Sequence, residues 1–138
     1  MYFANYLDSA VTVSNHAKHG RSTKTFLNEG RFDGIKDLSG PYTGDGQFPS
    51  SGHNILNEAK SGDYVFIQFG HNDGDNVNNR GTYNNKPELK TRQSYHCNLE
   101  TMVTQARSKG LIPVILTSVS TPYAKESGDQ GGTIPYFV

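Results

Sequence analysis

The chain has 138 residues, and its 13 Lys and Arg are balanced by 13 Asp and Glu, so the formal net charge is zero. This length fits one domain, and the balanced charge argues against a strongly basic binder of nucleic acid or of an anionic membrane surface. Hydrophobic residues make up only 33% of the chain, which indicates many loops or an incomplete core. Because disorder usually needs high net charge as well, we expect a folded chain.

Several further classes are excluded by the sequence. The longest apolar runs are far too short to span a membrane, and the first residues show no basic stretch followed by an apolar one, so no signal peptide is visible. Cys97 is the only cysteine, which excludes an internal disulfide and a cysteine-rich zinc site.

The predicted elements alternate between strands and helices along the chain. A short β-branched run at 11–13 predicts a first strand, and a helix is expected over 23–28. A second helix is expected over 54–60, just before the strongest strand signal at 63–69. That run, DYVFIQF, is nearly continuous in β-forming residues and lies between two glycines.

The second half of the chain continues this alternation. Apolar residues recur at helical spacing over 95–106, and Lys109 and Gly110 supply the basic last turn and the glycine stop of that helix. The run 111–117, LIPVILT, predicts the third strand. Because the last two strands are almost continuously apolar, we expect burial on both faces, as in a parallel sheet. The element order therefore predicts an α/β fold with helices against a parallel sheet.

Two stretches dense in Gly, Pro, Asn and Asp, at 39–52 and 73–87, are predicted to be loops. Two long loops in a small domain are more often functional than idle.

Polar residues follow the first and second predicted strands, where ligands bind in parallel sheets. Gly20 lies in the segment after the first strand, and Asn72 lies in the turn after the second. A backbone N–H and an uncharged side-chain amide aimed at one point can form an oxyanion hole for acyl transfer. The alternative is that both segments are ordinary turns, in which glycine ends a strand and Asn72 caps the next element.

The segments 20–32 (GRSTKTFLNEGRF) and 61–74 (SGDYVFIQFGHNDG) together resemble a known enzyme family. The second holds the G-x-N-D block of the SGNH (GDSL-type) hydrolases. The first is similar to the G-R-S-x-x-[ST]-[FY]-x-x-E-G-R segment of the rhamnogalacturonan acetylesterase group. The resemblance covers about 2–121, with an insertion around 39–51. It implies a flavodoxin-like, three-layer α/β sandwich, in which Gly20 gives its backbone N–H and Asn72 its side-chain amide to the oxyanion.

The resemblance also implies parts that this sequence does not show. The family's mechanism needs a serine nucleophile in a G-D-S block, and an Asp and a His in a D-x-x-H block. Asp8 and Ser9 imitate the end of G-D-S, but Leu7 replaces the glycine, so we interpret Ser9 as a surface residue. No D-x-x-H occurs. We therefore expect residues 1–138 to be a partial SGNH hydrolase domain, without the first-block strand and the C-terminal catalytic segment.

Other polar residues are weaker candidates for the missing chemistry. His71 adjoins Asn72, and we interpret it as a pocket-wall or structural residue. Solvated side chains are expected for the histidines on polar loops, which are His16, His19 and His53. Two serines that follow the third strand could line the cleft, although no G-x-S-x-G elbow aims them; they are Ser118 and Ser120.

Known ligand motifs are absent from the sequence. The oxygen-rich run 73–79 fails the EF-hand pattern at its fifth and sixth positions. No phosphate-loop or dinucleotide glycine pattern occurs, and the helical neighbours His96 and Cys97 cannot face one metal. The sequence thus predicts no cofactor and no metal site.

The resemblance implies a carbohydrate esterase that hydrolyses acetyl esters on a pectic polysaccharide such as rhamnogalacturonan, by a serine acyl-enzyme mechanism in the full-length form. The alternatives are an inactive remnant or sugar-binding module, and a fragment without independent biology. Three cations near Gly20 could meet the acidic substrate backbone or could be a solvated helix start; they are Lys18, Arg21 and Lys24. We further expect a secreted monomer whose partner is the polysaccharide, with no nucleic acid and no membrane.

Overall fold

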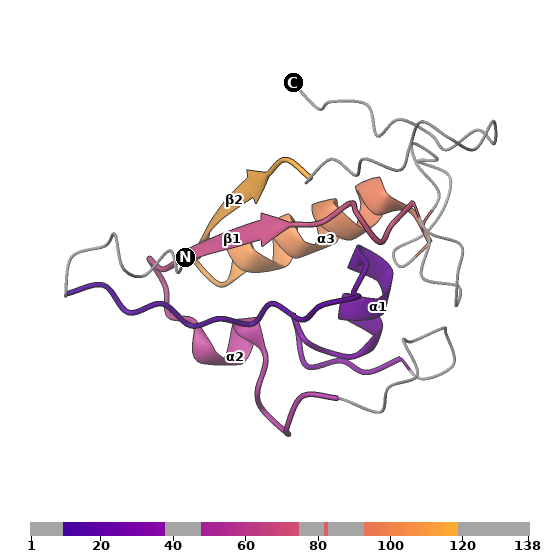
Figure 1. The fold of residues 1–138 in the computed structure, drawn as a ribbon. Coiled ribbons are helices and arrows are strands. Elements are labelled where there is room, and N and C mark those ends of the chain that lie inside the picture. The colour runs from indigo at the N-terminus through magenta and orange to yellow at the C-terminus, as the bar shows by residue number, and fades with distance from the viewer. Residues whose placement is uncertain (1–9, 38–47, 75–81, 83–92, 119–138) are drawn as a thin grey trace, which may run out of the picture.

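The computed structural model describes residues 10–37, 48–74, 82 and 93–118 (Figure 1). Two helices precede a parallel pair of strands that is connected through a third, longer helix. The elements are α1 (Thr23–Asn28), α2 (Ile55–Glu58), β1 (Tyr64–Gln68), α3 (Tyr95–Ser108) and β2 (Ile112–Leu116). The strands pair in parallel from Tyr64 opposite Ile112 to Gln68 opposite Leu116. The predicted α/β class and the parallel sheet are therefore confirmed.

Local sequence signals explain where the helices begin and end. Ser22 is the N-cap of α1, and its hydroxyl accepts from the Thr25 N–H while the Ser22 N–H donates to the Thr25 hydroxyl, which forms a capping box. Asn54 caps α2 in a similar way. The helix α3 ends at Ser108, and Gly110 lies just after the cap residue Lys109 with a φ of 78°, a conformation that favours glycine. A Cβ at Gly110 would also overlap the Ser61 hydroxyl, so this position fixes how the α3 end meets the start of β1.

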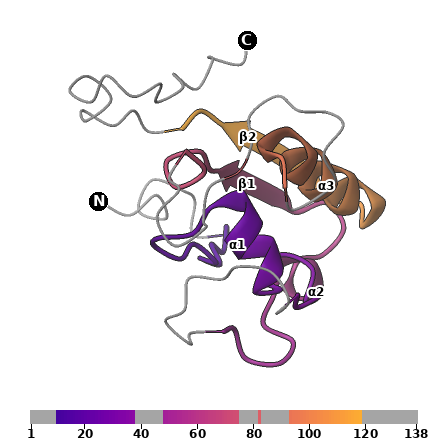
Figure 2. The same cartoon turned by 90° about the vertical axis from the view of Figure 1, so that its right-hand side faces the viewer.

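One hydrophobic core joins the three helices to a single face of the sheet. The inward side chains of β1 are Val65 and Ile67, which are 5% and 3% exposed. They pack with buried residues of α1 and α3 and of the segments that follow these helices, namely Phe26, Leu27, Phe32, Met102, Ala106 and Leu111. Ile55 and Leu56 of α2 are partly buried against the same cluster. Figure 2 shows these helices gathered beside the two strands.

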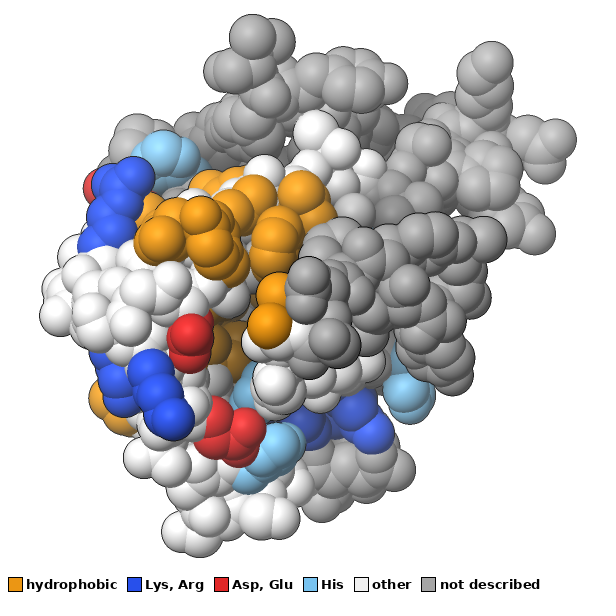
Figure 3. Space-filling view, turned by 90° about the vertical axis from the view of Figure 1, so that its left-hand side faces the viewer, with side chains coloured by type: hydrophobic (Ala, Val, Ile, Leu, Met, Phe, Trp, Pro, Cys, Tyr) orange, Lys and Arg blue, Asp and Glu red, His pale blue; other side chains and the backbone are white. Residues whose placement is uncertain are grey.

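The opposite face of the sheet is exposed. Tyr64, Phe66 and Ile112, which share this face in the parallel register, are 64%, 53% and 43% exposed, and Figure 3 shows hydrophobic side chains gathered at the surface. The predicted burial on both faces is therefore wrong for the described residues, because every described helix packs on the Val65 face. The described residues provide the sheet and one flanking layer of the predicted three-layer sandwich.

The predicted strand at 11–13 is also wrong. These residues form no strand, and Val11 and Val13 are 52% and 43% exposed. A strand requires a neighbour that completes its backbone hydrogen bonds, and within the described ranges β1 and β2 pair only with each other. No helix in the described part of the chain is long and apolar enough to cross a membrane. Asp8, Ser9, Ser120 and most of the two predicted loops lie outside the described residues.

Leu27 provides a test of the one-sided core. Leu27→Ala should lower the free energy of unfolding by about 2–5 kcal/mol, because this side chain is fully buried and its removal leaves a cavity. The same substitution at Leu116, which is 40% exposed, should cost less than about 1 kcal/mol. Urea unfolding followed by circular dichroism measures both, and equal losses would contradict the assigned core.

Candidate functional site

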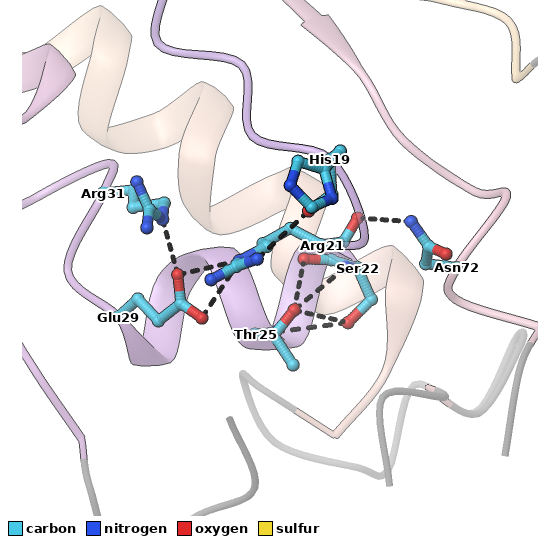
Figure 4. A network of polar contacts seen from close by, with 7 residues as sticks. All are labelled: His19, Arg21, Ser22, Thr25, Glu29, Arg31 and Asn72. Atoms are coloured by element: carbon cyan, nitrogen blue, oxygen red, sulfur yellow. Dashed lines mark hydrogen bonds and ion pairs between the residues drawn. The ribbon is translucent and has the colours of Figure 1, made fainter. Parts of the chain in front are cut away.

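The two loops that were predicted to carry the site meet in the structure. The side-chain amide of Asn72 donates to the carbonyl oxygen of Arg21 at 3.2 Å, which joins the turn after β1 to the segment before α1 (Figure 4). Gly20 immediately precedes Arg21 and has a φ of 73°, a conformation that favours glycine. The geometry thus brings Asn72 beside the Gly20 segment, and the oxyanion role of both residues stays a prediction.

The turn that carries Asn72 is held at both of its ends. The Tyr95 hydroxyl donates to the carbonyl of Phe69 at 3.1 Å, and the Asp73 N–H donates to the carbonyl of Gly70 at 3.1 Å. Burial raises the pKa of Tyr95 to about 12, and the nearby charge of Asp73 acts in the same direction. Tyr95 therefore remains a protonated hydrogen-bond donor throughout the neutral pH range.

A buried polar network connects this turn to α1 and α3. The Asp73 carboxyl accepts from the Thr23 backbone N–H at 3.0 and 3.1 Å and from the Thr23 hydroxyl, and Asn98 of α3 donates its amide to that hydroxyl at 2.9 Å. Thr82 adds a further hydroxyl donor to Asp73. Burial raises the pKa of Asp73, although the hydrogen bonds from Thr23 and Thr82 act against this shift. Asp73 thus fixes the Asn72 turn on the first residue of α1.

A buried ion cluster fixes the other loop. The Nε atom of Arg21 lies 3.1 and 3.0 Å from the two carboxylate oxygens of Glu29, and Arg31 pairs with the same carboxylate (Figure 4). The Arg21 and Glu29 side chains are each only 2% exposed. Arg21 also donates from Nη1 to the carbonyl of His19 at 3.1 Å, so one guanidinium holds the backbone on both sides of Gly20.

Comparison with curated proteins gives a consistent set of relatives. Rhamnogalacturonan acetylesterase RhgT of Bacillus subtilis is 35% identical over 126 residues, which cover 91% of this chain and 41% of the relative. The probable rhamnogalacturonan acetylesterase YesY of the same organism is 31% identical over 121 residues, 86% of this chain and 43% of the relative. A rhamnogalacturonan acetylesterase of Emericella nidulans is 36% identical over 70 residues, which cover 51% of this chain and 20% of the relative. No protein-family model matches the chain.

This chain is related to the SGNH-type rhamnogalacturonan acetylesterases. It spans about two fifths of the length of the two Bacillus relatives. The structure shows what the residues of the 20–32 motif do physically. Its Arg, Glu and second Arg form the buried ion cluster, and its Ser and Thr form the capping box of α1. The acetylesterase motif therefore builds the support of the Gly20 segment.

One of the three cations near Gly20 is unsuitable for contact with an acidic substrate. Arg21 is 5% exposed and its guanidinium is engaged by Glu29 and His19. The sequence did not reveal the burial of Arg21, because its partner Glu29 lies eight residues away, at the C-terminal end of α1. Lys18 and Lys24 are half-buried, and burial lowers the pKa of Lys24 against the opposite effect of the Asp73 charge.

The histidines differ in their surroundings. His71 is exposed next to Asn72, and His53 is exposed as expected for a loop. The expectation of a solvated side chain is wrong for His16, whose side chain is 11% exposed and stacks on the His53 ring with 4.9 Å between centroids. Burial lowers the pKa of His16, and the Glu58 carboxylate acts against this shift. The sequence offered no signal for this pairing, because the two histidines are far apart along the chain.

A serine beside His16 does not complete a catalytic relay. The Ser14 hydroxyl lies 3.1 Å from Nε2 of His16, and a carboxylate oxygen of Glu58 lies 3.2 Å from the same nitrogen. A Ser–His–acid relay needs the serine and the acid on different ring nitrogens. Ser118, the described candidate after β2, is half-buried.

The ion cluster predicts a large effect of a small change. Glu29→Gln keeps the shape of the side chain but removes the negative charge between two arginines, so the free energy of unfolding should fall by about 3–5 kcal/mol. Glu100→Gln is the matched control, because Glu100 is 70% exposed and lies 4.0 Å from His96. It should change stability by about 0.5 kcal/mol or less. Thermal and urea unfolding measure both variants, and similar small losses would show that the cluster carries little energy.

The polar network predicts a second effect. Thr23→Val removes the hydroxyl that donates to Asp73 and accepts from Asn98, so both buried groups lose a partner and stability should fall by about 1–3 kcal/mol. Thr104→Val changes an exposed threonine on α3 and should stay within about 0.5 kcal/mol of the unchanged protein. A Thr23→Val protein as stable as the Thr104→Val control would contradict the anchoring role of Asp73.

Proposed function

We propose that the protein is a carbohydrate esterase that hydrolyses acetyl esters on a pectic polysaccharide such as rhamnogalacturonan, by the serine acyl-enzyme mechanism of the SGNH hydrolases. The relationship to named rhamnogalacturonan acetylesterases supports the substrate class. The contact of the Asn72 amide with the Arg21 carbonyl at 3.2 Å supports the site, because it unites the two loops that carry the family's oxyanion residues.

In this proposal, the described residues serve the negative oxygen of the reaction. A serine hydroxyl attacks the acetyl carbonyl carbon, a histidine accepts the hydroxyl proton, and the former carbonyl oxygen becomes negative. The Gly20 N–H and a side-chain N–H of Asn72 donate to that oxygen. Collapse of the intermediate releases the sugar hydroxyl with the proton from histidine, and water then frees acetate from the serine. The serine, the aspartate and the histidine belong to the whole-protein proposal and have no counterpart among the described residues.

The fixed position of both donors supports an electrostatic role. An oxyanion hole lowers the barrier because its donors already point to the place where charge develops. The Asn72 turn is held by Asp73 and Tyr95, and the Gly20 segment is held by Arg21. These anchors are buried, so the two loops need little rearrangement when an ester binds. By resemblance alone we also propose a secreted protein that acts as a monomer.

A second candidate function is a sugar-binding module without catalysis. One observation favours it: Ser14, which lies beside a histidine and an acid, shares one ring nitrogen with that acid and so forms no catalytic relay. A module of this kind would keep the polysaccharide contacts of the relatives and lose the acyl transfer.

The amide of Asn72 is the sharpest test of the esterase proposal. In the full-length protein that carries this chain, Asn72→Ala should lower kcat for acetate release from acetylated rhamnogalacturonan by about 10²–10³-fold. KM should change little, because the donor acts mainly on the transition state. Asn57→Ala is the control, since Asn57 is an exposed asparagine of α2 that bonds to the Gly52 carbonyl. Equal activity of the two variants would contradict the oxyanion role.

The same assay separates the two candidate functions. A full-length protein that binds pectic oligosaccharides in calorimetry but releases no acetate would establish the binding module instead. The 138-residue chain alone should release no acetate. If its kcat matched that of the longer protein, the nucleophile would lie within residues 1–138 and the partial-domain interpretation would be wrong.

A further inference from the structure

Three side chains from separate segments converge beside α2. They are His16, from the extended segment before α1, His53, from the turn before α2, and Glu58, the last residue of α2. One ligand atom from each lies within 4.8 Å of the other two. In the face seen in Figure 3, histidine and acidic side chains lie side by side at the surface. We propose that these three residues form a zinc-binding site.

The chemistry of the three groups suits zinc. Two imidazole nitrogens and one carboxylate oxygen form a set of three protein ligands that zinc accepts together with a water molecule in the fourth position. Neutral histidines and an ionised glutamate give the set a net charge of −1, which favours a divalent cation. Softer or harder ions fit less well, because no thiolate is present for copper(I) and too few oxygens are present for calcium.

The spacing of the groups also suits zinc. Ligands about 2.1 Å from a tetrahedral zinc ion lie about 3.4 Å from one another. Nε2 of His16 lies 3.2 Å from one carboxylate oxygen of Glu58, close to that value. Nδ1 of His53 contacts the other oxygen of the same carboxylate. A zinc ion would replace these direct contacts after small side-chain movements, since the His53 and Glu58 side chains are 51% and 34% exposed.

Two neighbouring features support the site. The Ser14 hydroxyl lies 3.5 Å from the Glu58 oxygen that faces His16, so it can donate to that carboxylate and orient it, as outer groups do around bound zinc. The rings of His16 and His53 are already stacked at an interplanar angle of 25°, which limits their motion. The ligands are therefore partly arranged in advance.

Bound zinc would connect three segments that are separate along the chain. His16 lies in a segment without helix or strand, and the other two ligands lie at the two ends of α2. Residues 59–63 lead from α2 to the start of β1, whereas Asn72 follows the end of that strand (Figure 1). The proposed zinc site and the Gly20 and Asn72 loops therefore belong to opposite ends of β1, and this inference does not depend on the esterase proposal.

Titration of the 138-residue chain with zinc chloride in isothermal calorimetry tests the site. We expect one zinc ion per chain and a rise in the melting temperature at saturation, because the ion binds the folded form. His16→Asn, His53→Asn and Glu58→Gln should each weaken binding at least about 100-fold, since loss of an outer group alone costs 10–100-fold. His96→Asn, which removes an exposed histidine on α3, should leave binding unchanged.

Cobalt provides a measurement that needs no variant. Co²⁺ in a four-coordinate site of nitrogen and oxygen ligands should give strong visible absorption bands, and zinc should displace it. Absence of one-to-one binding by the unchanged chain would overturn the proposal. Equal weakening in His96→Asn and in the three ligand variants would overturn it as well, because binding would then be adventitious.

Discussion

The Glu29 carboxylate is the constraint on which the candidate site depends. It is 2% exposed and engages the guanidinium groups of Arg21 and Arg31 at the same time. Arg21 in turn bonds to the carbonyl of His19, and its own carbonyl accepts from Asn72. One buried acid at the end of α1 thus determines the path of the backbone around Gly20 and, through it, the partner that Asn72 meets.

The hydrophobic core and the polar contacts have different tasks in this chain. The side chains around Val65 and Ile67 supply the burial that stabilises the folded state. A buried ion pair contributes little net stability, because desolvation of the charges offsets most of their attraction, yet the loss of one member is costly. The polar networks around Glu29 and Asp73 therefore serve mainly to fix the positions of the Gly20 and Asn72 loops. They hold two loops that a core of aliphatic side chains could not orient.

Much of the fold was predictable from the sequence, because its signals are local. The bounds of α1 match the prediction, and α3 ends where Lys109 and Gly110 indicated. The predicted strand at 11–13 and the predicted burial of both sheet faces failed for one shared reason. A local sequence pattern does not reveal which other elements pack or pair beside a segment. Residues 11–13 have β-branched side chains but no described strand to pair with, and the apolar residues of β1 on the Phe66 face have no described helix above them.

The site shows the same division between local and long-range information. Gly20 and Asn72 were recognisable because each belongs to a short motif next to a predicted element. The role of Arg21 could not be recognised, since its partner Glu29 lies eight residues away. The cluster of His16, His53 and Glu58 could not be recognised either, since the spacing of its members matches no ligand motif. These contacts arise only when the 10–20 segment lies against α2 and α1 packs on α3. A motif can therefore indicate which loops are candidates for a site, whereas the buried groups that position these loops follow from the fold.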